Sequence, residues 1–168
     1  MNTQVALKSK NQTLSLTRGF FIKMTIDKYL ERMKSVIDGL PTQLENVVRS
    51  NAEQIADLNR EQQLYFKGED SKGHKLTPYT AVTKRIKQTK RQPFDRTTLN
   101  DTNDFYNAFQ VDYEKASYLV KIFSTDEKTP KLMSKYGKDI FGLQPINHKY
   151  LDEQIIKKHI DKWILSKL

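Results

Sequence analysis

The stretch QVDYEKASYLVKIFS, residues 110–124, decides the fold class, because its apolar side chains follow a period of two. The alternating apolar positions are Val111, Tyr113, Tyr118, Val120 and Ile122. A period of two places side chains on opposite faces of an extended strand, so the stretch predicts two antiparallel strands. We expect them to be joined at Glu114–Ala116.

The chain before this stretch follows a helical period instead. Its apolar residues recur every three or four positions, which produces one apolar stripe along a helix. Gly39 and Pro41 interrupt the stripe, and proline suits the first turn of a helix better than its interior. The pattern therefore predicts a short helix near 27–38 and a long helix near 42–66.

Residues 1–24 carry no sustained periodicity. They are polar and small until an apolar patch that includes Phe20 and Phe21. We expect an N-terminal arm that becomes ordered on assembly, when these aromatic residues contact a neighbouring subunit. The rest of the chain, 25–168, is expected to form one domain.

Shorter helices are predicted where a polar residue can cap the first turn. The expected N-caps are Thr77, Asp101 or Thr102, Thr129 and Asn147. Gly137 should end the third of these helices, and the last should be a C-terminal amphipathic helix. Helices beside a small antiparallel sheet, with a long helical region at the N-terminus, define an α+β fold.

The net charge of +9 is concentrated in one part of the 168-residue chain. Residues 67–96 carry 9 basic and 3 acidic side chains, a net charge of +6, whereas 1–66 carry 9 and 7 and 97–168 carry 11 and 10. The basic patch of this segment comprises Lys84, Arg85, Lys87, Lys90 and Arg91. Such a patch can attract nucleic-acid phosphates or an acidic protein surface, or it can be an ordinary solvated helix face.

Several classes of chemistry are not expected. Gly68 and Gly73 have the spacing of a phosphate-binding loop, but His74 and Lys75 stand where that loop needs lysine and a hydroxyl residue. The absence of cysteine excludes disulfides, thiolate zinc sites and cysteine nucleophiles. No apolar run approaches the length of a membrane span. We therefore expect no cofactor, no metal, no membrane contact and no enzymatic activity.

The central segment resembles a known family. It reads GEDSKGHKLTPYTAVTKRIK, residues 68–87, then a basic loop, then TLNDTNDFYNAFQV, residues 98–111. This spacing resembles the phage tail-completion, or head–tail connector, family of virion morphogenesis proteins. The positions that match the family's structural motif are Asp70, Gly73, Leu76, Thr83, Lys84, Arg85, Leu99, Thr102, Phe105 and Phe109.

One position departs from the family pattern. The family has glycine after the threonine, and this chain has Asn103. Asparagine tolerates a left-handed backbone better than other residues with a side chain, so the same turn is expected.

The resemblance implies a structural protein of the virion neck that forms a homo-oligomeric ring between portal and tail. The segment near 67–98 would project as a basic loop, with Pro93, Phe94 and Arg96 in contact with a neighbouring subunit. The implied partners are the protein itself, portal or adaptor proteins and tail proteins, with packaged DNA nearby. The implied location is the virion, after assembly in the host cytoplasm. The alternative is a basic nucleic-acid-binding module.

Overall fold

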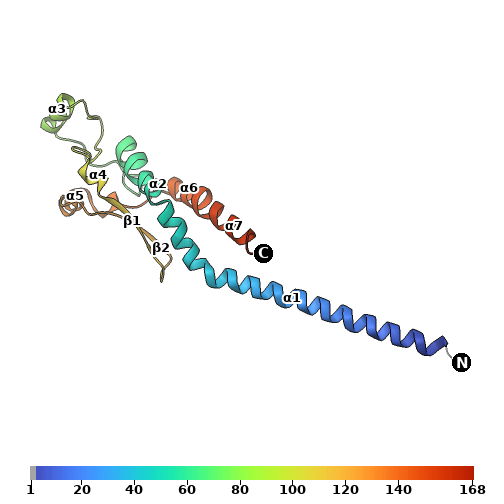
Figure 1. Ribbon diagram of the computed structural model, residues 1–168. Helices are drawn as coiled ribbons and strands as arrows, with labels where there is room; N and C mark the ends of the chain where they lie inside the picture. Colours follow the sequence, from blue (N-terminus) through green and yellow to red (C-terminus); the bar gives the residue numbers. More distant parts are fainter. Residues whose placement is uncertain (1–2) are drawn as a thin grey trace. The chain divides into compact units, whose positions relative to one another are not determined.

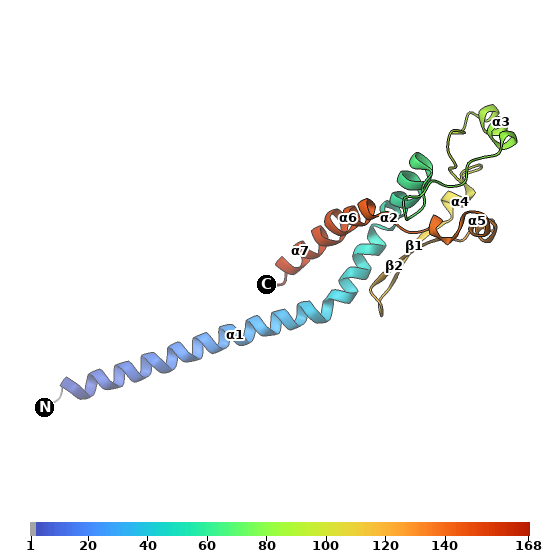
Figure 2. The same ribbon diagram turned by 180° about the vertical axis from the view of Figure 1, so that it is seen from behind.

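A computed structural model describes the backbone of residues 3–168 and the side chains of residues 25–168. The element order is shown in Figure 1 and, from behind, in Figure 2. The chain forms two compact units: one comprises the chain up to Leu40 together with Lys162–Leu168, and the other comprises Pro41–Asp161. The single domain 25–168 and the assembly-dependent arm stay predictions, and the side chains of Phe20 and Phe21 lie outside the described residues.

Helix α1 runs from Thr3 to Ser50 with Pro41 inside it, so the predicted break at Gly39–Pro41 is wrong. A proline inside a helix removes one backbone hydrogen bond, but an apolar stripe that continues on both sides can still favour a continuous helix. The interruption comes later, at Asn51, whose side-chain amide donates to the Val47 carbonyl at 2.7 Å.

The second predicted helix therefore continues after Asn51 as two short elements. They are α2, Ala52–Asp57, and the π-helical segment η1, Leu58–Tyr65. Both contribute to the core of the 41–161 unit. The buried apolar side chains of the helical part are Val47, Val48, Ile55, Leu58 and Leu64, and those of the later elements include Phe105, Tyr106, Phe109, Ile140, Leu151 and Ile155.

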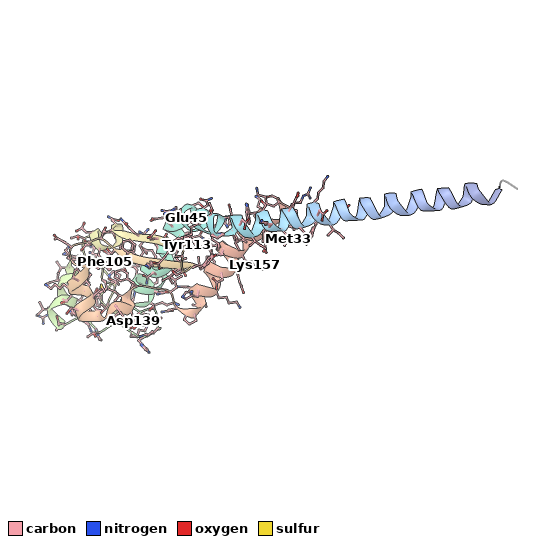
Figure 3. All side chains as sticks on the ribbon, turned by 90° about the horizontal axis from the view of Figure 1, so that it is seen from below. Met33, Glu45, Phe105, Tyr113, Asp139 and Lys157 are labelled. Atoms are coloured by element: carbon pink, nitrogen blue, oxygen red, sulfur yellow. The ribbon has the colours of Figure 1, made fainter. Side chains whose placement is uncertain are left out.

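Strands β1, Phe109–Glu114, and β2, Leu119–Ser124, form the two-stranded antiparallel sheet that the sequence predicts. The register pairs Val111 with Ile122, and the connecting turn occupies 115–118, so it begins one residue and ends two residues later than expected. One face of the hairpin is buried through Phe109, Tyr113 and Ile122, because alternate side chains point the same way. Figure 3 marks Tyr113 and, on the preceding helix α4, Phe105. The α+β prediction is confirmed.

Several predicted caps are displaced along the chain. Helix α3, Ala81–Thr89, is capped by Thr80, whose hydroxyl accepts from the Thr83 amide at 3.2 Å, and not by Thr77. Helix α4, Asp104–Asn107, has Asn103 at its N-cap, one or two residues after the positions expected. Helix α5, Thr129–Tyr136, has Lys128 at its N-cap, and it ends at Gly137 as predicted.

The C-terminal elements are η2, Lys138–Ile140, α6, Pro145–Tyr150, η3, Leu151–Lys157, and α7, Lys158–Leu165. Asn147 was expected to cap this region, but Gln144 holds that position and Asn147 is buried inside α6. The Asn147 amide donates to the Leu58 carbonyl and to the side-chain oxygen of Gln63, both at 2.9 Å. The Gln63 oxygen also accepts from the Gln144 backbone amide at 2.7 Å. This buried amide network joins η1 to α6.

Candidate assembly surface

The turn that begins the basic segment is organised by Asp70. One of its carboxylate oxygens accepts from the backbone amides of Lys72 at 2.9 Å and His74 at 2.8 Å. Gly73 completes the turn with φ 82°, a left-handed conformation that glycine adopts without strain. Leu76 then enters the core with 6% of its surface exposed. Asp70, Gly73 and Leu76 therefore have structural roles.

Gly68 stands where two segments of backbone approach closely. Its φ is 64°, and a Cβ at this position would lie 3.1 Å from both the Thr97 carbonyl oxygen and the Arg96 Cβ. The Arg96 guanidinium donates to the Tyr65 carbonyl at 2.7 Å and pairs with Asp95. These contacts fix the loop to the end of η1.

The outgoing and returning parts of the basic segment are joined by hydroxyl groups. The Thr97 hydroxyl donates to the Thr77 carbonyl at 2.7 Å, and the Thr98 amide donates to the Tyr79 hydroxyl at 2.9 Å. The buried Tyr106 hydroxyl donates to the Thr98 carbonyl. Burial raises the pKa of Tyr106 far above its ordinary value, so this hydroxyl stays a donor at every working pH.

The returning segment contains two side-chain-bearing residues in the left-handed region. Leu99 has φ 57° and Asn103 has φ 71°. Asn103 thus adopts the conformation expected for the position where the resembled family has glycine. Its carbonyl accepts from the amides of Tyr106 at 3.0 Å and Asn107 at 2.9 Å, which starts α4. The neighbouring Thr102 hydroxyl donates to the Asp104 carboxylate.

Lys87 does not belong to the basic surface to which the sequence assigned it. Only 5% of its surface is exposed. Its ammonium group donates to the side-chain oxygen of Gln92 at 2.9 Å and to the Asn100 carbonyl, and it lies 5.3 Å from the centre of the Tyr79 ring. Lys87 therefore ties α3 to the returning segment.

Lys90 is also engaged within its own chain. It forms an ion pair with Asp101 at 2.7 Å, and its hydrogen bond holds the pKa of that carboxyl below the ordinary value. Lys84, Arg85 and Arg91 are exposed and have no ion pair among the described residues. Three of the five predicted patch cations thus stay available to a partner.

The loop 92–96 combines one internal anchor with one exposed ring. Arg96, expected at a subunit contact, donates to the Tyr65 carbonyl of its own chain, and its place at a contact stays a prediction. Phe94 has 41% of its surface exposed. With Pro93 and Tyr65 it lines an open hollow of about 500 Å³. Pro93 and Phe94 stay candidates for a contact.

Helix α3 adds apolar surface that the sequence analysis did not single out. Val82 and Ile86 are 68% and 49% exposed and lie one turn apart on the same side of the helix. Ile86, Leu99 and Leu132 contribute to a hollow of about 280 Å³ between α3 and α5. Helical periodicity alone would place Ile86 inward and Lys87 outward, so no pattern in the sequence indicated this exchange. We call the exposed side chains of α3 and of the loop that follows it the loop face: Val82, Ile86 and Phe94, with Lys84, Arg85 and Arg91. Val82, Arg85 and Ile86 share one side of α3, and Lys84 lies on another.

Across residues 25–168, no three histidine, aspartate or glutamate side chains gather closely enough to hold a metal ion. Within the described part of the chain, no helix has the length and apolarity needed to cross a bilayer. Comparison with known proteins returned no matching family model, no matching curated protein and no matching solved structure.

Proposed function

We propose that the chain is a non-enzymatic structural protein of a bacteriophage virion, forming a homo-oligomeric ring in the neck between portal and tail. The observation that carries this proposal is the backbone of Asn103, which has φ 71° where the head–tail connector family has glycine. A left-handed residue is uncommon outside glycine, so this agreement supports the resemblance beyond the match in spacing. The Asp70–Gly73 turn supports it in the same way.

The loop face supplies a surface of the kind such assembly requires. Protein interfaces combine an apolar centre with a polar rim, and rim charges mainly set the association rate and the register. Val82, Ile86 and Phe94 provide exposed apolar side chains, while Lys84, Arg85 and Arg91 provide unpaired charge. In this proposal the loop face contacts a neighbouring subunit or an acidic surface of a portal, adaptor or tail protein.

The test is immunogold labelling of particles from cells that carry the gene. We expect gold at one vertex, at the junction of head and tail. Particles without label, with all antigen left in the soluble fraction, would refute the structural role. The double variant Val82→Glu with Ile86→Glu should abolish incorporation into particles, because it places two charges in the apolar centre of the contact. Lys131→Glu with Ser134→Glu, at two exposed positions of helix α5, is the matched double control and should be incorporated normally.

The nucleic-acid alternative has a separate test. A protein that neutralises several phosphates loses affinity steeply as salt rises. Binding of duplex DNA should therefore be compared at about 50 and 200 mM salt. Equally negligible binding in both would remove this alternative, whereas binding that falls with salt and is lost when Lys84 and Arg85 become glutamine would favour it over the connector role.

A further inference from the structure

The N-terminal compact unit presents an apolar stripe that its own chain leaves uncovered. Along α1 the stripe comprises Ile26, Leu30, Met33, Ile37 and Leu40. The spacing alternates four, three, four and three residues, which is the heptad pattern of a helix that packs against another helix. Ile26, Leu30 and Ile37 are 52%, 58% and 65% exposed, and Met33 and Leu40 are half-buried, so most of the stripe faces solvent in the single chain. Met33 is marked in Figure 3.

One flank of the stripe is already occupied within the unit. The Arg32 guanidinium donates to the Leu168 carbonyl, and a Cβ at Gly39 would lie 3.1 Å from the Trp163 ring. Val36, on the same flank, is 5% exposed. The C-terminal segment therefore covers the flank formed by positions 32, 36 and 39. Ile26, Leu30 and Ile37 of the stripe stay exposed, and so does its other flank, which bears Asp27 and Lys34.

We propose that a second copy of the chain covers this stripe, with the two α1 helices antiparallel. In that register Ile26 packs against Ile37 of the second copy, and Leu30 packs against Met33 of the second copy. The four residues each occur twice, which gives four apolar layers related by a two-fold axis. The contact is isologous, so it differs from the head-to-tail contact that closes a ring, and it does not depend on the virion assignment.

Charge complementarity selects the antiparallel direction. Asp27 and Lys34 lie seven residues apart on the open flank, and neither has an ion pair among the described residues. In the antiparallel register Asp27 lies beside Lys34 of the second copy, and the two-fold axis repeats the pair. A parallel register leaves both charges without an opposite charge, because Lys34 then faces Tyr29 of the second copy.

Disulfide trapping tests the register directly, because the chain contains no cysteine. Ile26→Cys and Ile37→Cys are prepared separately, mixed and oxidised. Random exchange of chains between dimers makes half of them mixed, with one chain of each variant. We therefore expect about half of the protein in a species cross-linked between positions 26 and 37, with twice the 19.7 kDa chain mass. Ser35→Cys, on the solvent side of the same helix, is the control and should stay monomeric on denaturing gels.

The outcomes are decisive in both directions. Efficient cross-linking of Ile26→Cys with itself, or mixed cross-linking no higher than for Ser35→Cys, would overturn the antiparallel pair. Sedimentation of the unmodified protein gives an independent measurement. We expect Asp27→Lys to weaken dimerisation about tenfold, because two attractive pairs become repulsive. Adding Lys34→Asp should restore it. A wild type that stays monomeric at all concentrations would overturn the proposal.

Discussion

Replacing Lys87 by methionine separates a structural from a functional reading of the basic patch. Methionine keeps the length and most of the volume of the side chain but removes the charge and the donor. Two hydrogen bonds are lost, to the side chain of Gln92 and to the carbonyl of Asn100. The favourable position of the ammonium group over the Tyr79 ring is lost as well.

The expected loss of stability follows from these contacts. Hydrogen bonds from a charged donor contribute about 1.5–3 kcal/mol each, and leaving the Asn100 carbonyl without its donor costs a further 1–3 kcal/mol, roughly. Methionine avoids the cost of burying a charge, which is on the order of several kcal/mol and offsets most of this loss. We therefore expect Lys87→Met to lower the free energy of unfolding by about 2 kcal/mol. For a chain of this size, that corresponds to a melting temperature about 4–8 °C lower.

Urea unfolding followed by far-UV circular dichroism measures this difference. The curves should allow two transitions, since the chain has two compact units, and the effect should fall on the unit that contains 41–161. Lys84→Met is the matched control: the same charge is removed from an exposed site, so the change should stay within about 0.5 kcal/mol. If Lys87→Met unfolds within that same margin, Lys87 does not hold α3 and the structural reading is refuted.

Two further predictions concern single residues of the same unit. Asn103→Ala should be about 1 kcal/mol less stable than Asn103→Gly, because alanine is strained at φ 71°; equal urea midpoints would contradict this. Burial, followed by the charge of Asp57, raises the pKa of Glu61. A carboxyl whose pKa is higher in the folded state stabilises the fold at low pH, where it is protonated, and this contribution is lost as the pH rises through the folded-state pKa. Glu61→Gln should therefore be more stable than wild type at pH 7 and should lose that advantage below about pH 4. Melting temperatures of both proteins at the two pH values measure this difference. A variant that is less stable than wild type at pH 7 would contradict the predicted direction of the effect.

The sequence predicted those features that depend on neighbouring residues. The hairpin followed from a period of two over one short stretch, and that period survives because one face is buried through Phe109, Tyr113 and Ile122. The left-handed residue at Asn103 followed from its place in a local motif. The prediction of Thr77 as a cap was wrong because the segment TPYT contains two threonines, and the hydroxyl of the second, Thr80, is the one that reaches the amide three residues on.

The features that the sequence did not predict depend on distant partners. Asn147 is polar and near a helix start, which suggests a cap, but its partners Leu58 and Gln63 are more than 80 residues away. The sequence around Lys87 suggests a surface cation, because the Asn100 carbonyl that accepts its hydrogen bond lies 13 residues further along the chain. Pro41 predicts a helix start because proline suits the first turn, whereas in the structure Pro41 lies inside α1.

The distribution of charge shows how a local count can mislead about function. Residues 67–96 have a net charge of +6, yet two of their lysines pair with carboxylates outside the segment, Lys72 with Asp139 and Lys90 with Asp101. Lys75 pairs with Glu69, and Lys87 and Arg96 bind backbone carbonyls of their own chain. The four remaining cations are Lys67, Lys84, Arg85 and Arg91.

Four cations limit what this segment can do with nucleic acid. Each neutralised phosphate contributes about 0.9 to the slope of log affinity against log salt, so the segment supports a slope of at most about 4. That is a weak, sequence-independent attraction. The exposed apolar side chains Val82, Ile86 and Phe94 add nothing to phosphate binding, whereas they suit the centre of a protein contact. The combination of few free cations with exposed apolar groups therefore favours a protein partner for the loop face.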